Sequence, residues 1–113
     1  MRTGAFQSAE IEELVARAQA AADGYVNDAV RSELLNVGVY VLGAGAVDDQ
    51  TPHEEDEVYY AVRGRARFQV EGEDRPVEAG SLLFVGAGAD HRFHDVEEEL
   101  VLVVFWAPPH DEP

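Results

Sequence analysis

Two periods of apolar residues divide the chain. Between Ser8 and Ala22 the apolar side chains recur at the spacing of one helical face, at Ile11, Leu14, Val15, Ala18 and Ala22. This spacing predicts an amphipathic helix with one buried stripe. Ser8 is placed to cap this helix and Asp23-Gly24 to end it. The segment 25–35 can continue as a second helix, although its Asn, Asp and Ser residues disfavour helix.

From Leu34 onward the apolar residues follow the period of β-strands. Six short strands are predicted, at Val37–Leu42, Val58–Arg63, Ala66–Val70, Leu82–Val85, Arg92–Val96 and Leu100–Trp106. Glycine-containing turn signals separate them at short intervals, including 43–45, 63–65, 71–74 and 79–80. This pattern indicates an all-β antiparallel sandwich or barrel, with the N-terminal helix packed across an edge or an open end.

Length and composition point to one compact domain. The chain has 113 residues, of which 46% are hydrophobic, enough for one core. Within it we expect a helical extension over 1–33, the barrel over 34–108 and an acidic tail over 109–113. Pro108-Pro109 marks the end of regular structure.

The charge and the missing cysteines restrict the chemistry. With no cysteine, disulfides, thiolate metal sites and cysteine nucleophiles are excluded, so a metal site must use nitrogen and oxygen ligands. The net charge of −15 argues against nucleic acid, because a surface this acidic repels a polyanion. The clustered acids, including Asp48 and Asp49, are expected to be solvated. Without a signal-like N-terminus or a membrane-length apolar run, a cytoplasmic protein that does not contact membranes is expected.

Three residues of metal-ligand type stand where strands can aim them inward. His53 and Glu57 are four positions apart in a strand-like stretch, so they should face the same side of one strand. His91 follows another β-rich segment. Two imidazoles and one carboxylate form a ligand set suited to a divalent transition metal. As structural alternatives, the histidines can bond to the backbone and Glu57 can pair with an arginine such as Arg63 or Arg67.

The spacing of these residues resembles the two sequence motifs of the cupin superfamily. The first motif contains a glycine, His-x-His, a glutamate and a glycine, which correspond here to Gly45, Thr51-Pro-His53, Glu57 and Gly64. The second contains a glycine, Pro-x-Gly, a histidine and an asparagine, which correspond to Gly80, Gly86-Ala-Gly88, His91 and Asp95. Fifteen residues separate Gly64 from Gly80, matching the family's short spacing between motifs.

The resemblance is to small single-domain bacterial cupins, and it covers about 34–108. It implies a double-stranded β-helix, or jelly-roll, barrel. It also implies a metal held by His53, Glu57 and His91, with Thr51 in place of the family's first motif histidine. A two-histidine, one-carboxylate set leaves open positions for substrate or O₂. Fe, Mn, Ni, Co and Zn all remain candidates for the metal.

Alternation along the strands also predicts the surroundings of the metal. Tyr59 should continue the inward face of Glu57, and Phe93 that of His91, so both are expected to line a substrate pocket. Tyr59 is a candidate to donate a proton to substrate, with packing as the alternative. Gln50 and Thr51 adjoin the ligands and can supply a weak oxygen ligand or a substrate contact, or simply begin a strand.

The two remaining histidines are not expected to bind the metal. His94 has the opposite parity to His91, so its side chain should face away from the interior. His110 lies in the C-terminal tail, where a solvated side chain is expected.

Three functions fit the sequence. The first is a metal-dependent enzyme that acts on a small organic molecule, with dioxygenase chemistry ahead of isomerase or lyase chemistry. The second is a metal-binding or small-ligand-binding protein without turnover. The third is a metal-free structural barrel. In each case a homodimer is expected, with the apolar stretch Leu100–Trp106 as a candidate interface.

Overall fold

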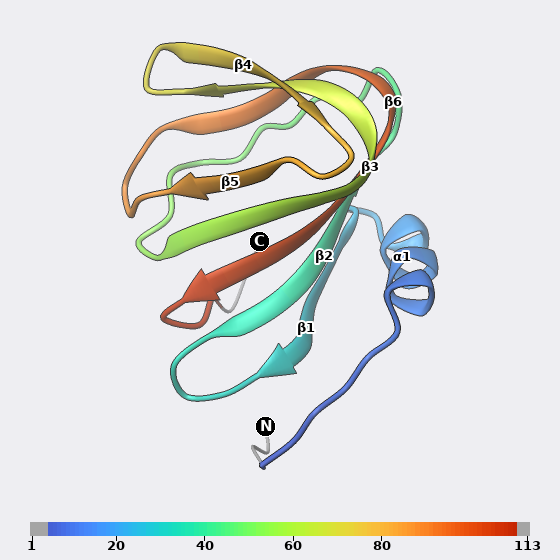
Figure 1. The fold of residues 1–113 in the computed structure, drawn as a ribbon, viewed down its shortest axis with the longest axis vertical. Coiled ribbons are helices and arrows are strands. Elements are labelled where there is room, and N and C mark those ends of the chain that lie inside the picture. The colour runs from blue at the N-terminus through green and yellow to red at the C-terminus, as the bar shows by residue number, and fades with distance from the viewer. Residues whose placement is uncertain (1–4, 111–113) are drawn as a thin grey trace.

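The computed structural model describes residues 5–110, which form one helix and six strands (Figure 1). They are α1 (Ile11–Ala20), β1 (Tyr25–Arg31), β2 (Asn36–Leu42), β3 (Asp56–Val70), β4 (Glu73–Glu78), β5 (Leu82–Val85) and β6 (His91–Ala107). The strands pair antiparallel in the order β1-β2-β6-β3-β4, and β5 pairs with β3. The predicted all-β fold with an N-terminal helix is confirmed.

The two longest strands bend around the interior (Figure 1). β3 has 15 residues and β6 has 17, and each joins two segments that the sequence predicted as separate strands. Gly64, predicted to lie in a turn, instead lies within β3 at φ 103°. A Cβ atom there would lie 2.2 Å from the carbonyl oxygen of Glu99 in β6. Only glycine therefore lets β3 and β6 stay in contact through this bend.

Two further predictions of helices and strands were wrong. The segment 25–35 forms no second helix, because β1 pairs with β2 in a ladder that includes Tyr25 opposite Tyr40. The ladder provides hydrogen bonds for the backbone N–H and C=O groups, and the weak helix propensity of this segment does not compete with it. β4 was missed because the sequence pattern indicated a turn over all of 71–74. The turn is shorter than that, and strand pairing already begins again between Val70 and Glu73.

The helix is shorter than predicted. Its N-cap is Glu10, whose side chain makes no capping hydrogen bond, so Ser8 lies outside the helix and does not cap it. The buried stripe is Leu14, Val15 and Ala18, as the spacing predicted.

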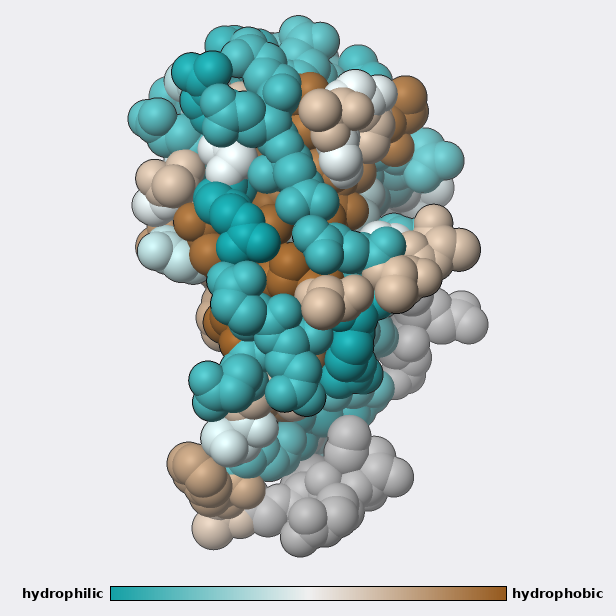
Figure 2. Space-filling model, turned by 90° about the vertical axis from the view of Figure 1, so that its right-hand side faces the viewer, coloured by the Kyte–Doolittle hydropathy of each residue, from teal (hydrophilic) through white to brown (hydrophobic). Residues whose placement is uncertain are grey.

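The sheet has a core on each side where the helix covers it. The interior core includes Tyr59, Phe68, Phe93, Leu102 and Trp106. A second core lies between α1 and the outward residues of β1, β2 and β6, among them Val26, Val39, Val41 and Val101. Figure 2 shows the face that carries α1, where mainly hydrophilic residues cover the hydrophobic ones beneath. The helix thus packs on the outer face of the sheet.

The predicted dimer interface is mostly occupied within the chain itself. Of Leu100–Trp106, only Phe105 is exposed. It forms an outer apolar row with Tyr60, Leu82 and Phe84, whose strands pair with one another. The homodimer remains a prediction, and this exposed apolar row is one candidate interface for it. No helix among residues 5–110 is long and apolar enough to cross a membrane.

Candidate metal centre

Strand pairing brings Glu57, Tyr59 and His91 together inside the barrel. Glu57 and Tyr59 lie two residues apart on β3, so both face inward, and His91 is the first residue of β6. Their exposed fractions are 1%, 0% and 3%. Three polar side chains are therefore withdrawn from water, which requires that they satisfy one another.

Short contacts join these side chains. The Tyr59 hydroxyl donates to Glu57 Oε2 at 2.9 Å and lies 3.2 Å from His91 Nε2. His91 Nε2 is also 3.2 Å from Glu57 Oε1. Trp106, directly opposite Glu57 on β6, donates its indole N–H to Glu57 Oε2 at 2.9 Å. Glu57 thus pairs with the interior groups and not with Arg63 or Arg67, whose partners are Glu12 and Asp74.

The orientation of His91 leaves one ring nitrogen free to bind a cation. Its Nδ1 lies 2.9 Å from the Ala89 carbonyl, which can only accept, so Nδ1 carries a proton. In the neutral ring, Nε2 then presents its lone pair toward Glu57. A lone pair and a carboxylate oxygen 3.2 Å apart require a proton or a metal ion between them.

His53 reaches the same place from a loop. It lies three residues before β3, so the argument that it shares a strand face with Glu57 was wrong. Its Nε2 is 3.3 Å from Gln50 Oε1, and its ring centroid is 5.8 Å from that of His91. Even so, His53, Glu57 and His91 offer ligand atoms that all lie within 4.8 Å of one another.

Burial and mutual contact shift the pKa values of these groups. Burial alone would raise the pKa of Glu57, but the hydrogen bond and charge of His91 outweigh it and hold that pKa below its usual value. Burial would lower the pKa of His91, yet the hydrogen bond to Glu57 raises it overall. Burial lowers the pKa of His53 and, with the neighbouring Glu57 charge, raises that of Tyr59 far above 10. Glu57 is therefore a carboxylate and Tyr59 a protonated phenol at neutral pH.

The donor set fits a divalent transition-metal ion. Imidazole and carboxylate are ligands for Zn, Fe, Mn, Co and Ni. An ion about 2.1 Å from each ligand atom needs separations of about 3 to 4 Å, so the 3.2 Å between His91 Nε2 and Glu57 Oε1 already suits it. A ligand atom of His53 lies within 4.8 Å of those of Glu57 and His91. The Ala89 carbonyl and the Trp106 indole orient two of the ligands, as outer partners do in metal sites.

A buried aspartate that the sequence analysis did not select as a site residue holds the loop that carries Gln50 and His53. Asp48, predicted to be solvated, is only 2% exposed. Its carboxylate accepts from the Tyr40 hydroxyl at 2.9 Å, the Gln50 amide at 2.7 Å and the backbone N–H of Phe93 at 2.8 Å. Composition gave no signal for this role, because Asp48 looks like its exposed neighbour Asp49. Trp106 was also missed, although its parity with Leu102 and Val104 placed it inward.

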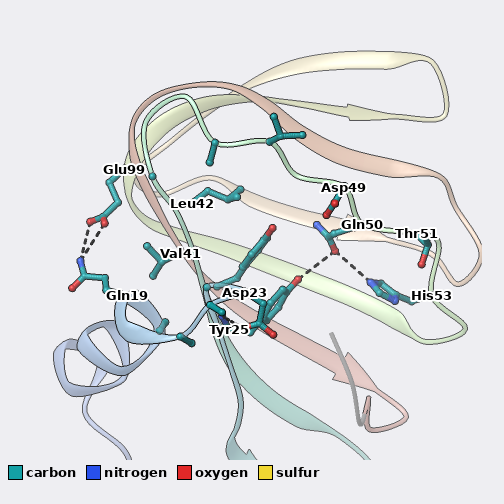
Figure 3. Close-up of a pocket in the computed structure, with 18 residues that line it drawn as sticks. Gln19, Asp23, Tyr25, Val41, Leu42, Asp49, Gln50, Thr51, His53 and Glu99 are labelled. Atoms are coloured by element: carbon teal, nitrogen blue, oxygen red, sulfur yellow. Dashed lines mark hydrogen bonds between the residues drawn. The ribbon is translucent and has the colours of Figure 1, made fainter.

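A cavity lined in part by His53 lies between the C-terminal part of α1 and the loop 43–53 (Figure 3). It has a volume of about 620 Å³, and Tyr25, Tyr40, Gln50, Thr51 and His53 line it. In Figure 3 the Gln50 side chain lies between Tyr25 and His53 and bonds to both.

The four predicted pocket residues fall into two groups. Gln50 and Thr51 line the cavity, whereas Tyr59 and Phe93 lie deeper and are buried. Phe93 packs edge-on against Tyr59, with ring centroids 5.0 Å apart. The Tyr59 hydroxyl, 3.2 Å from Gln50 Oε1, marks the boundary between cavity and interior.

The two other histidines have different positions. His94 lies on the outer surface, where its Nε2 is 2.8 Å from Asp74, as alternation predicted. His110 is not solvated: its side chain is only 12% exposed and its ring lies beside those of Trp106 and His53. The prediction failed because the His110 backbone bonds to Asn27 and Asn36, which holds its ring against the barrel.

A model of the Cupin domain family matches residues 38–108. The chain belongs to the cupin family. The matched region begins within β2 and contains all three candidate ligands. This confirms the resemblance drawn from the two motifs and the small cupin barrel that it implied.

The chain is similar to a curated protein in sequence and to several solved structures in fold. An uncharacterized protein of Streptomyces coelicolor is 42% identical over 99 residues, which cover 88% of this chain and 93% of that one. TT1209 of Thermus thermophilus is 26% identical, with a TM-score of 0.72 and coverage of 91% and 98%. DMSP lyase DddQ of Ruegeria pomeroyi DSS-3 is 24% identical with a TM-score of 0.66. The match covers 73% of this chain but only 42% of DddQ, so that likeness shows the fold alone.

Proposed function

We propose that this cupin is a metal-dependent enzyme that acts on a small organic molecule, with His53, Glu57 and His91 as the metal ligands. The observation that carries the proposal is the convergence of ligand atoms of these three side chains within 4.8 Å, with His53 also lining a cavity of about 620 Å³. The metal itself would act as a Lewis acid on a substrate oxygen. Buried ligands with oriented partners favour a resident ion over an adventitious one.

Tyr59 favours proton-transfer chemistry, as in a lyase or isomerase. Its hydroxyl contacts both Glu57 and His91 and faces Gln50 at the cavity boundary. Its raised pKa keeps the proton on the phenol oxygen, so Tyr59 can donate a hydrogen bond or a proton to a substrate oxygen. Glu57 Oε2 holds this hydroxyl in place, and Trp106 holds Glu57. The sequence placed dioxygenase chemistry first, and the two-histidine, one-carboxylate set keeps it as the second candidate.

The cavity suggests the charge of the substrate. Its lining includes Asp23, Asp49 and Glu99, and none of the described residues that line it is arginine or lysine. Tyr25 and Tyr40, stacked with centroids 4.0 Å apart, form part of its wall. Because like charges repel in a partly desolvated cleft, a neutral or positively charged substrate fits better than a multiply charged anion.

Metal content and the Tyr59→Phe variant test the proposal. Purified protein should contain about one equivalent of a divalent transition metal by elemental analysis, because His53, Glu57 and His91 form one set of ligands, called the inner set below. Tyr59→Phe keeps the ring that packs on Phe93, so it should retain the metal. It should lose at least about 100-fold in turnover, the lower range for a missing proton donor. Products are followed by NMR with neutral and cationic substrates that carry an acidic C–H beside a carbonyl.

Each result decides between the candidate functions. If the wild type and Tyr59→Phe turned over substrate equally and consumed oxygen, dioxygenase chemistry would become the first candidate. The proposed metal centre would be wrong if the purified protein contained no metal and a chelator left its melting temperature unchanged. Bound metal without turnover of any substrate would favour the non-catalytic binding protein. Tyr60→Phe, on the outward face of the same strand, is the matched control and should behave as the wild type.

A further inference from the structure

A second group of metal-ligating side chains lies beside His53, outside the inner set. Glu55 and His110 offer ligand atoms that lie within 4.8 Å of each other and of His53. The His53 and His110 rings meet edge to face, with centroids 4.7 Å apart. All three residues are partly buried, unlike the exposed acids elsewhere on the surface. The group joins the loop before β3 to the segment after β6.

The position of His110 is fixed by its backbone. Its N–H donates to Asn36 Oδ1 at 2.8 Å. Its carbonyl accepts from the amides of Asn27 and Asn36 at 2.9 and 3.0 Å. Asn36 is fully buried, and the His110 ring lies 5.0 Å, centroid to centroid, from that of Trp106. The imidazole is therefore held in place by the barrel, as a preorganised ligand should be.

One ring nitrogen of His110 has no partner. Nδ1 is 3.1 Å from Glu55 Oε1, whereas Nε2 is buried and makes no hydrogen bond to any described residue. A buried polar atom left without a partner is costly, so it calls for an explanation. A cation between Glu55 and His110 Nδ1 would use the convergence of these two side chains with His53. It would leave the proton of the His110 ring on Nε2.

We propose that His53, Glu55 and His110 form an outer position for a divalent transition-metal ion. Two imidazoles and one carboxylate suit the same metals as the inner set. The 3.1 Å between His110 Nδ1 and Glu55 Oε1 already matches ligand atoms that share one ion. Because His53 belongs to both groups, the two positions are filled one at a time. The outer position is nearer to solvent and binds more weakly.

Removing the inner set isolates the outer position. His91→Ala, or Glu57→Gln if that variant fails to fold, is titrated with Zn²⁺ alone while the imidazole ¹⁵N resonances of the histidines are recorded by NMR. The resonances of His53 and His110 should shift together, and those of His94 should not. The same variant with His110→Gln or Glu55→Gln added should bind Zn²⁺ at least about 10-fold more weakly. His94→Ala, added instead, is the control and should change nothing.

Two outcomes would overturn the outer position. One is an unshifted His110 resonance at millimolar Zn²⁺ in the folded inner-site variant. The other is equal Zn²⁺ affinity with and without His110→Gln. Neither depends on turnover or on metal in the wild-type protein, so the proposed function stands or falls separately. If His110 only fastens the chain end, His110→Gln should lower the melting temperature and leave Zn²⁺ affinity unchanged.

Discussion

The deep part of the candidate metal site, inside the barrel, and its mouth, at the cavity, are built in different ways. The inner side chains, Glu57, Tyr59 and His91, come from strands and are at most 3% exposed. The mouth side chains, His53 and Gln50, come from the loop before β3 and are only partly buried. Strand geometry fixes the direction of the first group, whereas the second depends on hydrogen bonds to neighbours. Loss of an inner ligand should therefore lower metal affinity most, and loss of Gln50, which is not one of the three proposed ligands, should lower it less.

The largest expected effect comes from the inner carboxylate. Glu57→Gln keeps the shape of the side chain but replaces a charged ligand with a neutral amide. Changes to the outer partners of metal ligands already cost about 10- to 100-fold in affinity, so loss of this ligand should exceed about 100-fold. Competition with a chelating dye measures the dissociation constant.

A mouth variant provides the comparison. Gln50→Ala removes a side chain that contacts His53, Tyr59 and Tyr25 without being one of the three ligands. It should weaken binding by only about 10-fold, the lower end for an outer partner. If Gln50→Ala matched Glu57→Gln, the division between inner ligands and adjustable mouth would be wrong.

The next effect concerns the link between the two ends. Asp48 bonds to Gln50 in the mouth loop and to the backbone of Phe93 in β6. Asp48→Asn replaces one acceptor oxygen with a donor, so a buried hydrogen bond is lost and two donors face each other. We expect the free energy of unfolding to fall by about 2 kcal/mol, measured by urea denaturation of the metal-free protein.

The neighbouring aspartate gives a matched control. Asp49 lies one residue away and is exposed. Asp49→Asn should change the free energy of unfolding by less than about 0.5 kcal/mol. Equal losses in the two variants would mean that net charge, and not the buried contacts of Asp48, stabilises this loop.

The same division explains what the sequence could predict. Alternation placed Glu57 and Tyr59 inward because a strand leaves only two directions for each side chain. Alternation also led us to expect His53 near Glu57, and the two do lie close together, but His53 is a loop residue to which alternation does not apply. Asp48 and His110 were missed because their burial depends on contacts with other strands, which alternation does not reveal. These contacts are with Tyr40 and Phe93 for Asp48, and with Asn27 and Asn36 for His110. The family motifs pointed to the candidate ligands but carried no information about these contacts.

Long-range pairing also accounts for the errors in the fold. The segment that forms β1 has mixed local preferences, and the strand exists because β2 offers it a partner. Gly64 looked like a turn residue because glycine serves both turns and close backbone contacts. Only the approach of Glu99, 35 positions away in the sequence, distinguishes the two. Periodicity therefore predicts which face a residue occupies more reliably than where a strand ends.

The smallest expected effect is on the outer face, where alternation can be tested directly. His94 lies three residues after His91 on β6, and its side chain points to the opposite side, toward Asp74. Asp74 also accepts from Arg67, so the cluster keeps one ion pair without the imidazole. His94→Ala should leave metal affinity unchanged by dye competition, because no atom of His94 reaches the inner ligands. A loss of affinity would mean that β6 is displaced by one residue, since such a shift exchanges its inward and outward side chains.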